Sequence, residues 1–377
     1  MNNYHIYEEI GRGKYSVVYK GRKKKTIEFV AVKSVDRMRR KKLMNEVRIF
    51  HNLDHPNVLK FHNWYETRNH LWIIFEYCPG GDLLKLLEDD KKLPEQTIKK
   101  FAFELCEGLS YLHENGIIFA DLKPGNVLIN EFSQTKLADF GLSKKISDLI
   151  AVNEAGNAEQ KRVEKTGSVY YMAPELFKDD GVLSFYSDFW SLGIVMYEMA
   201  NGQVPFYQSS LQRVLKQITE EPVQELSNFS EDFNDLVRRL LEKDPARRIT
   251  WHELKAHPFW YSTAPVYQFK RKSFYPDQPQ FDKYLLGRGI NPQHYHDQRA
   301  NPIADRFLRS NSYQQQSNEG GIDILRLSMN VKRNMLREQE ESGDANENYH
   351  TKESAQHRAG QTNNMMNNRG MGQPQQP

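Results

Sequence analysis

The 377-residue chain has little cysteine, no long apolar run and no surplus of charge of one sign. Its two cysteines, Cys78 and Cys106, lie far apart without metal-ligand spacing, which fits a reducing compartment. No apolar stretch approaches the ~20 residues that cross a bilayer, and the polar amino terminus lacks the apolar core of a signal sequence. The net charge of +3 indicates no nucleic-acid-binding surface. We therefore expect a soluble cytoplasmic protein with no membrane span and no nucleic acid partner.

Two short polar segments suggest a chemistry. Asp121 opens the run Asp-Leu-Lys-Pro-Gly-Asn, which ends at Asn126, and Asp139 follows in Asp-Phe-Gly. Phosphoryl transfer needs a carboxylate that accepts the proton of the attacking hydroxyl, and oxygen ligands that hold Mg²⁺ against nucleotide phosphates. Asp121 suits the first role, and Asn126 and Asp139 suit the second. Lys123 can place a fixed positive charge beside the transferring phosphate.

Further motifs flank these segments in a fixed order. Residues 11–13 (Gly-Arg-Gly) and 30–33 (Val-Ala-Val-Lys) precede them, and residues 173–175 (Ala-Pro-Glu) and 188–193 follow. This order matches the signature set of protein kinases. Over residues 4–260 the chain resembles a eukaryotic protein kinase. The resemblance implies a bilobal α+β fold, with a β-rich amino-terminal lobe, a helical carboxyl-terminal lobe and ATP bound between them.

The first glycine pair lies at a turn between the strands predicted at 7–10 and 17–20, with a third strand at 29–32. A glycine at such a turn lets backbone N–H groups approach a phosphate. By itself the turn is typical of an ordinary hairpin, and only the neighbouring motifs favour a nucleotide site. Ser16 replaces the third glycine of the usual pattern, which we expect to stiffen the loop without excluding phosphate contact.

Lys33 lies in an apolar strand, where an unpaired ammonium is costly to bury. We expect ATP phosphates and Glu46, on the next helical stretch, to be its partners; a solvent-facing Glu46 is the alternative. The basic run 37–42 before that helix indicates solvated surface, with an anion or acidic-partner site as the alternative.

The kinase resemblance also implies the nucleotide contacts. Phe75 would be the gatekeeper behind the adenine, and Glu76 and Cys78 would present backbone groups to its edge. The residues implied to surround the cofactor are Ile10, Gly11, Arg12, Gly13, Val18, Ala31, Lys33, Glu76, Cys78, Asp82, Leu128 and Asp139. The residues implied to be catalytic are Asp121, Lys123, Asn126, Lys33 and Glu46, with Asn126 and Asp139 as the Mg²⁺ ligands.

In the large lobe, apolar residues at helical spacing predict a long buried helix over 94–115 and another around 190–196. His113, near the end of the first, is interpreted as structural. The resemblance implies that Asp188 accepts backbone hydrogen bonds from the catalytic loop and that Arg248 pairs with Glu175.

The catalytic loop departs from the kinase pattern, because the usual His-Arg-Asp reads Phe119-Ala120-Asp121. Phe119 still supplies an apolar side chain for the hydrophobic spine, which would also contain Phe50, Phe61 and Phe140. Ala120 removes the arginine that normally pairs with a phosphorylated activation segment. We therefore expect an enzyme that depends less on phosphorylation, or one of weak intrinsic activity.

The activation segment, which lies between Asp139 and Glu175, is long. Residues 146–165 are polar and charged without a clear period, which indicates a mobile insertion. Residues 166–172 would form the peptide-docking loop. Lys123, together with Ser168 in that loop, favours serine or threonine over tyrosine as the acceptor.

Two stretches, 7–22 and 64–72, resemble in detail the fourth unc-51-like kinase and its Fused/RUNKEL relatives. That group includes pseudokinases, and its members have long helical-repeat tails and links to cilia or microtubules; we do not expect such repeats in this chain. It nevertheless keeps the catalytic residues named above. The leading interpretation is a Mg²⁺-dependent Ser/Thr protein kinase acting on protein substrates. The alternatives are an ATP-binding pseudokinase scaffold and a structural ciliary or microtubule-associated protein without ATP.

Composition changes after residue 260, so we expect a kinase domain at 1–260 and an extension at 261–377. Residues 261–290 are rich in aromatics, proline and lysine and are expected to lie against the domain. A short amphipathic helix is predicted near 322–338, either a docking helix for a regulatory partner or a weakly populated one. Residues after about 340 are rich in Asn, Gln, Gly and Met and are expected to be disordered.

Overall fold

The computed structural model describes residues 3–13, 15–149, 169–178 and 181–262, together with Tyr267, Lys283 and Leu286. The chain divides into two units, Met1–Ser317 and Asn318–Pro377, and every described residue belongs to the first. The helix expected near 322–338, the disorder expected after 340 and most of the expected insertion lie outside the described residues. None of the helices in the described ranges has the length and hydropathy needed to cross a membrane.

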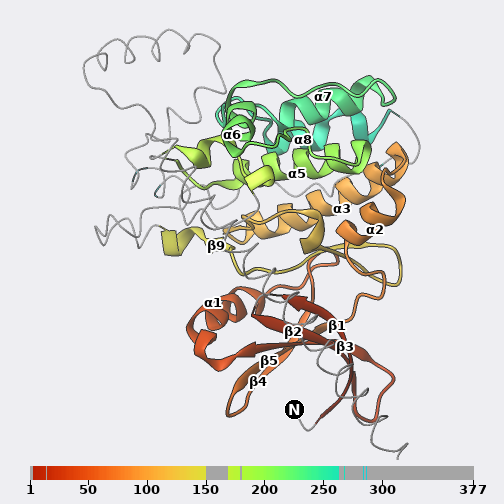
Figure 1. The fold of residues 1–377 in the computed structure, drawn as a ribbon, viewed down its shortest axis with the longest axis vertical. Coiled ribbons are helices and arrows are strands. Elements are labelled where there is room, and N and C mark those ends of the chain that lie inside the picture. The colour runs from red at the N-terminus through yellow and green to blue at the C-terminus, as the bar shows by residue number, and fades with distance from the viewer. Residues whose placement is uncertain are drawn as a thin grey trace, which may run out of the picture. The chain divides into compact units, whose positions relative to one another are not determined.

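The amino-terminal lobe is a five-stranded sheet, as expected for the fold (Figure 1). Its strands are β1 (Tyr4–Gly13), β2 (Ser16–Lys23), β3 (Phe29–Asp36), β4 (Phe61–Glu66) and β5 (His70–Glu76). They run antiparallel in the order β1-β2-β3-β5-β4. Alternate residues of β3 and β5, such as Val30, Val32 and Ile74, are buried under the rings of Tyr19 and Trp72, which follows from the period-two geometry of strands.

The glycine pair lies in a strand and not in the turn where the sequence predicted it. β1 continues through Gly13, so that Gly11 pairs with Val18 and Gly13 with Ser16. Register shifts interrupt β1 between Ile6 and Gly11. Bulges of this kind add twist to a strand, and the irregularity explains why the sequence predicted a strand that was too short.

One helix accompanies the sheet. The 3₁₀ turn η1 (Arg37–Arg39) leads into α1 (Arg40–Phe50), which carries Glu46. At the end of α1 the Phe50 ring lies 5.1 Å from that of Phe75 on β5. Arg37 and Arg40 of the basic run both bind Glu66, at 2.9 and 3.3 Å, so that part of the run is paired with an acid on β4.

The carboxyl-terminal lobe is helical (Figure 1). Its helices are α2 (Leu83–Asp90), α3 (Glu95–Glu114), α5 (Phe185–Asn201), α6 (Leu211–Glu220), α7 (Glu231–Leu240) and α8 (Trp251–Ala256). Its short strands are β6 (Ile117–Ile118), β7 (Val127–Ile129), β8 (Thr135–Leu137) and β9 (Lys144–Lys145). The remaining 3₁₀ turns are η2 (Pro124–Asn126), η3 (Val169–Tyr171), η4 (Pro174–Phe177) and η5 (Pro258–Trp260).

Helices α3 and α5 confirm the two predicted buried helices. Ile98, Leu105 and Leu112 of α3 are fully buried. Nearly every residue of α5 is buried, as expected for a helix that is apolar all round. A Ser184–Ser187 capping box begins α5, and left-handed Gly202 (φ 78°) ends it. This rigid, central helix carries Asp188 to the catalytic loop.

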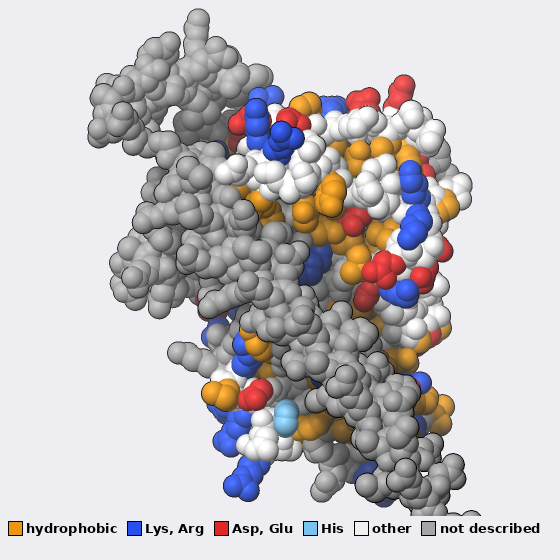
Figure 2. Space-filling model, in the orientation of Figure 1, with side chains coloured by type: hydrophobic (Ala, Val, Ile, Leu, Met, Phe, Trp, Pro, Cys, Tyr) orange, Lys and Arg blue, Asp and Glu red, His pale blue; other side chains and the backbone are white. Residues whose placement is uncertain are grey.

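Charges of both signs are interspersed over the helical lobe on the face shown in Figure 2. That distribution agrees with the small net charge of the chain.

Candidate active site

A carboxylate on α5 holds the backbone of the catalytic loop by hydrogen bonds. Asp188, which is fully buried, accepts hydrogen bonds from the backbone N–H groups of Phe119 (2.9 Å) and Ala120 (2.8 Å). Its Oδ2 also lies 2.8 Å from Nε2 of the buried His113. Trp251 donates to Nδ1 of that ring (3.1 Å), so the histidine proton belongs on Nε2 and is donated to Asp188. Burial lowers the pKa of His113 and keeps it neutral, and its predicted structural role is confirmed.

The loop places three polar side chains in one cluster. Lys123 Nζ lies 2.9 and 3.2 Å from the two carboxylate oxygens of Asp121. Asn126 donates through Nδ2 to the Asp121 backbone oxygen (2.8 Å) and to its Oδ2 (2.7 Å). Burial raises the pKa of Asp121, and the Lys123 ammonium offsets only part of that shift. Asp121 is thus a carboxylate with increased proton affinity, oriented from two sides.

A second cluster joins the two lobes. Lys33 on β3 lies 3.1 Å from Glu46 on α1, as predicted, and 3.5 Å from Asp139. Burial alone would lower the pKa of Lys33, but the two carboxylates outweigh it and raise the pKa. Burial would likewise raise the pKa of Asp139, but Lys33 and the Gly141 N–H lower it. Both groups are therefore charged, and the small lobe is held to the Asp-Phe-Gly segment.

Asp139 of the second cluster and Ala120, which precedes Asp121, adopt left-handed backbone conformations. Ala120 has φ 66° and Asp139 has φ 60°. Such conformations cost of order 1–2 kcal/mol for a residue with a side chain, and they concentrate at functional sites. Hydrogen bonds from Ala120 N to Asp188 (2.8 Å) and from Gly141 N to Asp139 (3.3 Å) hold them in place.

One expected metal ligand, Asn126, belongs to the Asp121 cluster, and the other, Asp139, belongs to the Lys33 cluster. The Asn126 amide nitrogen is occupied by Asp121, whereas its Oδ1 makes no hydrogen bond to the described residues. Asp139 keeps a half-exposed carboxylate. Mg²⁺ is typically held by one or two protein oxygens together with phosphates and water, and this pair fits that pattern. No group of three or more His, Cys, Asp or Glu side chains that could hold a metal occurs among the described residues.

The residues expected around adenine are only partly buried. Val18, Ala31 and Leu128 have intermediate exposure, and Ile10 is 42% exposed. The hinge is the segment 76–78 at the end of β5, which connects the two lobes. There the Glu76 N–H donates to Lys60 O (3.0 Å) and the Cys78 oxygen accepts from Gly81 N (3.3 Å). Burial raises the pKa of the Cys78 thiol to about 12, so this cysteine is not an activated nucleophile.

Two expected nucleotide contacts have other partners in the structure. The Arg12 guanidinium binds Glu9 (Nε to Oε1, 2.8 Å), and Arg12 pairs with Val17 in the sheet. Asp82 caps α2 by accepting from Lys85 N (2.8 Å). One carboxylate oxygen of Asp82 therefore caps a helix, in addition to the contact with the cofactor that the kinase resemblance implies.

The hydrophobic spine forms with phenylalanine in place of histidine. Ring centroids lie 5.1 Å apart for Phe119 and Phe140, 4.6 Å for Phe140 and Phe50, and 6.4 Å for Phe50 and Phe61. Aromatic pairs at these separations attract one another. The first departure of the catalytic loop is therefore accommodated by packing.

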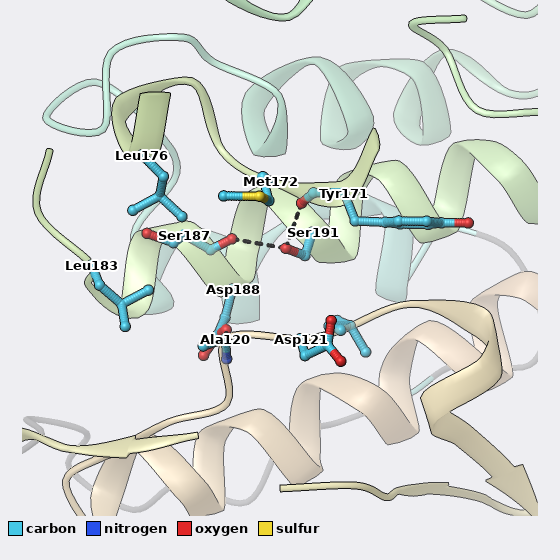
Figure 3. A pocket seen from close by; sticks show the side chains of 10 residues that line it. Ala120, Asp121, Tyr171, Met172, Leu176, Leu183, Ser187, Asp188 and Ser191 are labelled. Carbon is cyan, nitrogen blue, oxygen red and sulfur yellow. Dashed lines mark hydrogen bonds between the residues drawn. The ribbon is translucent and has the colours of Figure 1, made fainter. Parts of the chain in front are cut away.

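The second departure leaves a small cavity. Figure 3 shows Ala120 facing the docking-loop residues Tyr171 and Met172 and the α5 residues Ser187 and Ser191. The cavity measures about 20 Å³, room for about one water molecule. Ser191 Oγ donates to the backbone oxygens of Tyr171 (2.8 Å) and Ser187 (3.1 Å) along one wall. None of the described residues that line this cavity is a cation, so these residues place no positive charge beside Asp121.

The start of the activation segment is more ordered than the sequence predicted. Ser143 Oγ donates to Phe119 O (2.9 Å), and β9 pairs with β6. Ile146, which we expected to begin a mobile insertion, is 1% exposed and opens a helical turn over 146–149. The prediction was wrong at this position because the residues that follow Ile146 are mostly polar, so that one buried apolar side chain gave no periodic signal. Arg48 of α1 binds Asp148 at 2.6 Å, a contact that the sequence reasoning missed.

The end of the segment is fixed as predicted. Arg248 Nη1 and Nη2 both bind the Glu175 carboxylate at 2.9 Å. Tyr171 donates to Glu198 of α5 (2.7 Å). Ser168 and Thr166 lie outside the described residues.

Comparison with known sequences accounts for this geometry. The protein kinase domain model matches residues 4–260. The chain belongs to the protein kinase family. The five-stranded lobe, the helical lobe and the Lys33–Glu46 pair are thus features of a kinase domain.

Individual relatives refine the placement. The chain is 50% identical over 292 residues to serine/threonine-protein kinase RUNKEL of Arabidopsis thaliana, a match that covers 77% of this chain and 20% of that protein. It is 40% identical over 281 residues to serine/threonine-protein kinase ULK4 of Mus musculus, covering 69% and 22%. For serine/threonine-protein kinase ULK3 of Mus musculus the identity is 33% over 273 residues, covering 69% and 55%. These names support the unc-51-like and Fused-like branch, and the chain spans about a fifth of the length of the first two relatives.

Proposed function

We propose that this chain is a Mg²⁺-dependent Ser/Thr protein kinase that transfers the γ-phosphoryl group of ATP to protein hydroxyls. The observation that carries the proposal is the Lys33 ammonium, which lies 3.1 Å from Glu46 and 3.5 Å from Asp139. Kinases need this ion pair and this aspartate in place together before they transfer phosphate.

Bound Mg·ATP supplies the electrophilic phosphorus and neutralises the charge that develops on its oxygens. Lys33 would bind nucleotide phosphates while Glu46 keeps its ammonium oriented. Asp139 and Asn126 Oδ1 would hold the metal, and Gly11 and Gly13 would offer backbone N–H groups. These roles rest on the positions of the side chains and on the relatives' names.

Asp121 would act on the other substrate. Its raised pKa suits a group that must accept a proton from a serine or threonine hydroxyl. Lys123, 2.9 Å away, orients the carboxylate and can stabilise charge on the transferring phosphate. The docking loop beside Ala120 and Tyr171 would receive the substrate chain.

Two substitutions test the assignment. Asp139→Asn removes a charged ligand from the metal and should abolish Mg²⁺-dependent ATP binding or turnover. Asp121→Ala should reduce phosphotransfer by about 10²–10⁴-fold, the usual contribution of a general base, with nucleotide affinity nearly intact. The measurements are radiolabelled-ATP transfer to a generic basic protein, with Mg²⁺ and then Mn²⁺, and ATP titration calorimetry. Wild-type activity in Asp139→Asn would refute the metal assignment.

One observation favours a second candidate, a nucleotide-binding pseudokinase scaffold. Among the described residues that line the cavity beside Ala120 there is no cation to order a phosphorylated activation segment. If the parent chain binds ATP but transfers no phosphate with either metal, the scaffold function replaces the catalytic one.

The proposal also includes the domain boundaries and the cellular location of the protein. We assign residues 1–260 to the catalytic domain and 261–377 to an extension that binds a regulatory protein. The resemblance to the Fused/RUNKEL group supports a cytoplasmic protein associated with cilia or microtubules. Fluorescence imaging of the full chain, beside a variant truncated after residue 262, tests both statements.

A further inference from the structure

A buried lysine lies behind the hinge and has no part in the mechanism described above. Lys136 is the central residue of β8, and its side chain is 8% exposed. Its ammonium lies 2.9 Å from Glu76 Oε1 on the hinge and donates to the backbone oxygen of Pro56 (2.8 Å), between α1 and β4. One cation thus joins three segments that are far apart in the sequence.

The hinge side of this contact is equally specific. Glu76 Oε1 also accepts from Lys60 N (2.6 Å), and Glu76 N donates to Lys60 O (3.0 Å). The carboxylate of Glu76, which is 22% exposed, and its backbone N–H are therefore both engaged. A side chain held by a lysine and an N–H together has little rotational freedom.

The backbone on both sides of Lys136 is also fixed. Asn57 Nδ2 donates to Thr135 O (2.9 Å), and Leu137 N donates to Asn57 O (2.9 Å). Thr135 donates to Glu104 of α3 through both N–H (2.7 Å) and Oγ1 (2.9 Å). The lysine therefore extends from a rigid base in the helical lobe to the hinge of the other lobe.

Its position in the sheet connects this bridge to the nucleotide site. Lys136 pairs directly with Leu128 across β7 and β8, and Leu128, one of the residues implied to surround the cofactor, would form the floor of the adenine pocket. Asp139 follows three residues later. The hinge, the pocket floor and the metal-binding aspartate are thus linked through one residue.

We propose that Lys136 is a positioning residue that fixes the hinge at Glu76 relative to the floor of the adenine site. The proposal rests on the proposed kinase function, because it concerns the binding of ATP. Removing one member of a nearly buried ion pair leaves the other charge poorly compensated. The hinge would then relax away from β8, and the spacing between its backbone groups and Leu128 would widen.

Lys136→Met keeps the length of the side chain and removes the charge. We expect the KM for ATP and the calorimetric Kd for ADP to rise about tenfold, while kcat changes less than threefold, because Lys136 touches neither Asp121 nor the acceptor. Lys136→Arg, which keeps a cation, should restore most of the affinity. An unchanged KM in Lys136→Met, or an equal loss in kcat without a change in KM, would overturn the proposal.

The matched control is Lys99→Met. Lys99 is also a buried lysine, on α3, but it lies over Phe259 (5.1 Å) in the helical lobe. Its loss should reduce thermal stability and leave both nucleotide constants unchanged. If Lys99→Met raises the KM for ATP as much as Lys136→Met does, the effect is general destabilisation and the positioning role is refuted.

A double-variant cycle isolates the pair. Glu76→Gln should raise the KM for ATP several-fold, and the combination with Lys136→Met should be no worse than Lys136→Met alone, since the two groups act on each other. Fully additive losses would contradict the inference. Should Lys136→Met fail to fold, Glu76→Gln and Lys136→Arg decide it, and an unchanged KM in Glu76→Gln overturns it. A parent chain that binds no nucleotide refutes the kinase function itself, whereas a parent that binds ATP beside an unaffected Lys136→Met refutes the positioning role alone.

Discussion

Two ion pairs hold the activation segment, one near each end, and they differ in their surroundings. At the end of the segment, Glu175 and Arg248 form a bidentate pair whose side chains are 7% and 0% exposed. Near its start, Asp148 and Arg48 meet at 2.6 Å with side chains 45% and 58% exposed. The first pair belongs to the core of the helical lobe, and the second lies in solvent between α1 and the segment.

The difference in burial implies that the end of the activation segment is held more firmly than its start. A buried pair cannot lose one partner without leaving an uncompensated charge, so the end of the segment is fixed whenever the lobe is folded. An exposed pair is weak and is screened by salt. Ala120 replaces the arginine that would normally hold a phosphorylated segment. Among the described residues, the ion pair that connects the start of the segment to α1 is the exposed Arg48–Asp148 pair. The set of ion pairs can be tested in order of decreasing burial.

Arg248→Met should have the largest effect. The substitution leaves Glu175 buried and unpaired, and it also removes donors to the backbone oxygens of Tyr186 (2.6 Å) and Glu242 (2.9 Å). We expect the free energy of unfolding to fall by about 3–5 kcal/mol, the usual loss for one partner of a buried pair. Urea denaturation measures it. Arg247→Met, at the exposed neighbouring arginine, is the control and should change stability by less than about 0.5 kcal/mol.

Lys123→Met tests a pair of intermediate burial, in which the Asp121 and Lys123 side chains are 13% and 31% exposed. Loss of an oriented cation should lower kcat by about 10²-fold. Because Asp121 must be ionised to accept a proton, kcat should fall as the pH falls through its pKa. Burial raises that pKa and Lys123 lowers it, so the substitution should move the acidic limb of the kcat profile to higher pH. A limb that stays in place or moves to lower pH would show that Asp121 is not the titrating base.

The same shift has a consequence for stability. A carboxyl whose pKa is raised by folding binds its proton more tightly in the folded state than in the unfolded one. Asp121 therefore contributes most favourably at low pH, and its contribution declines as the pH rises from the unfolded pKa through the folded pKa. Asp121→Asn should remove this slope from the pH dependence of the unfolding free energy.

Thr166→Ala tests the missing cation at Ala120. A phosphate on Thr166 would normally gain 1–3 charge-assisted hydrogen bonds, but none of the described residues that line the cavity at Ala120 is a cation. The turnover number should change by less than about tenfold, or ~1.4 kcal/mol. Ala120→Arg with phosphorylated Thr166 should restore sensitivity. A hundredfold drop on phosphatase treatment, reversed by rephosphorylation, would show that another cation replaces the arginine.

Much of the architecture was predictable, because the signals were local or followed a strong period. The apolar spacing of α3 and the all-round hydrophobic α5 were found from their sequence patterns. The Glu175–Arg248 pair and the Asp188 hydrogen bonds followed from the kinase resemblance. The boundaries of β1 were missed, since its two register shifts break the alternation on which strand prediction depends.

Two tertiary contacts between charged residues, Lys136–Glu76 and Arg48–Asp148, could not be predicted. Lys136 stands in a Thr-Lys-Leu strand, where a lysine normally indicates the solvent-facing side, yet its ammonium lies 2.9 Å from Glu76, sixty residues earlier. Arg48 and Asp148 are a hundred residues apart, and no local pattern pairs them. Ile146 gave one usable signal, an apolar residue directly after two lysines, but a single residue has no period. The roles of the site residues themselves stay predictions until the substitutions above are measured.

Arg48→Met should have the smallest effect, and it completes the comparison. Both members of the Arg48–Asp148 pair are about half exposed, and pairs of that kind contribute roughly 0–1 kcal/mol. Since the contact links α1 to the activation segment, its loss should appear in kcat, by less than about fivefold, more than in the unfolding midpoint. Raising the salt concentration should reproduce most of the effect in the parent chain and add little in the variant. Arg48→Met could instead lower the free energy of unfolding as much as Arg248→Met does. The two ends of the segment would then be held equally strongly, and the distinction between a fixed end and an adjustable start would be wrong.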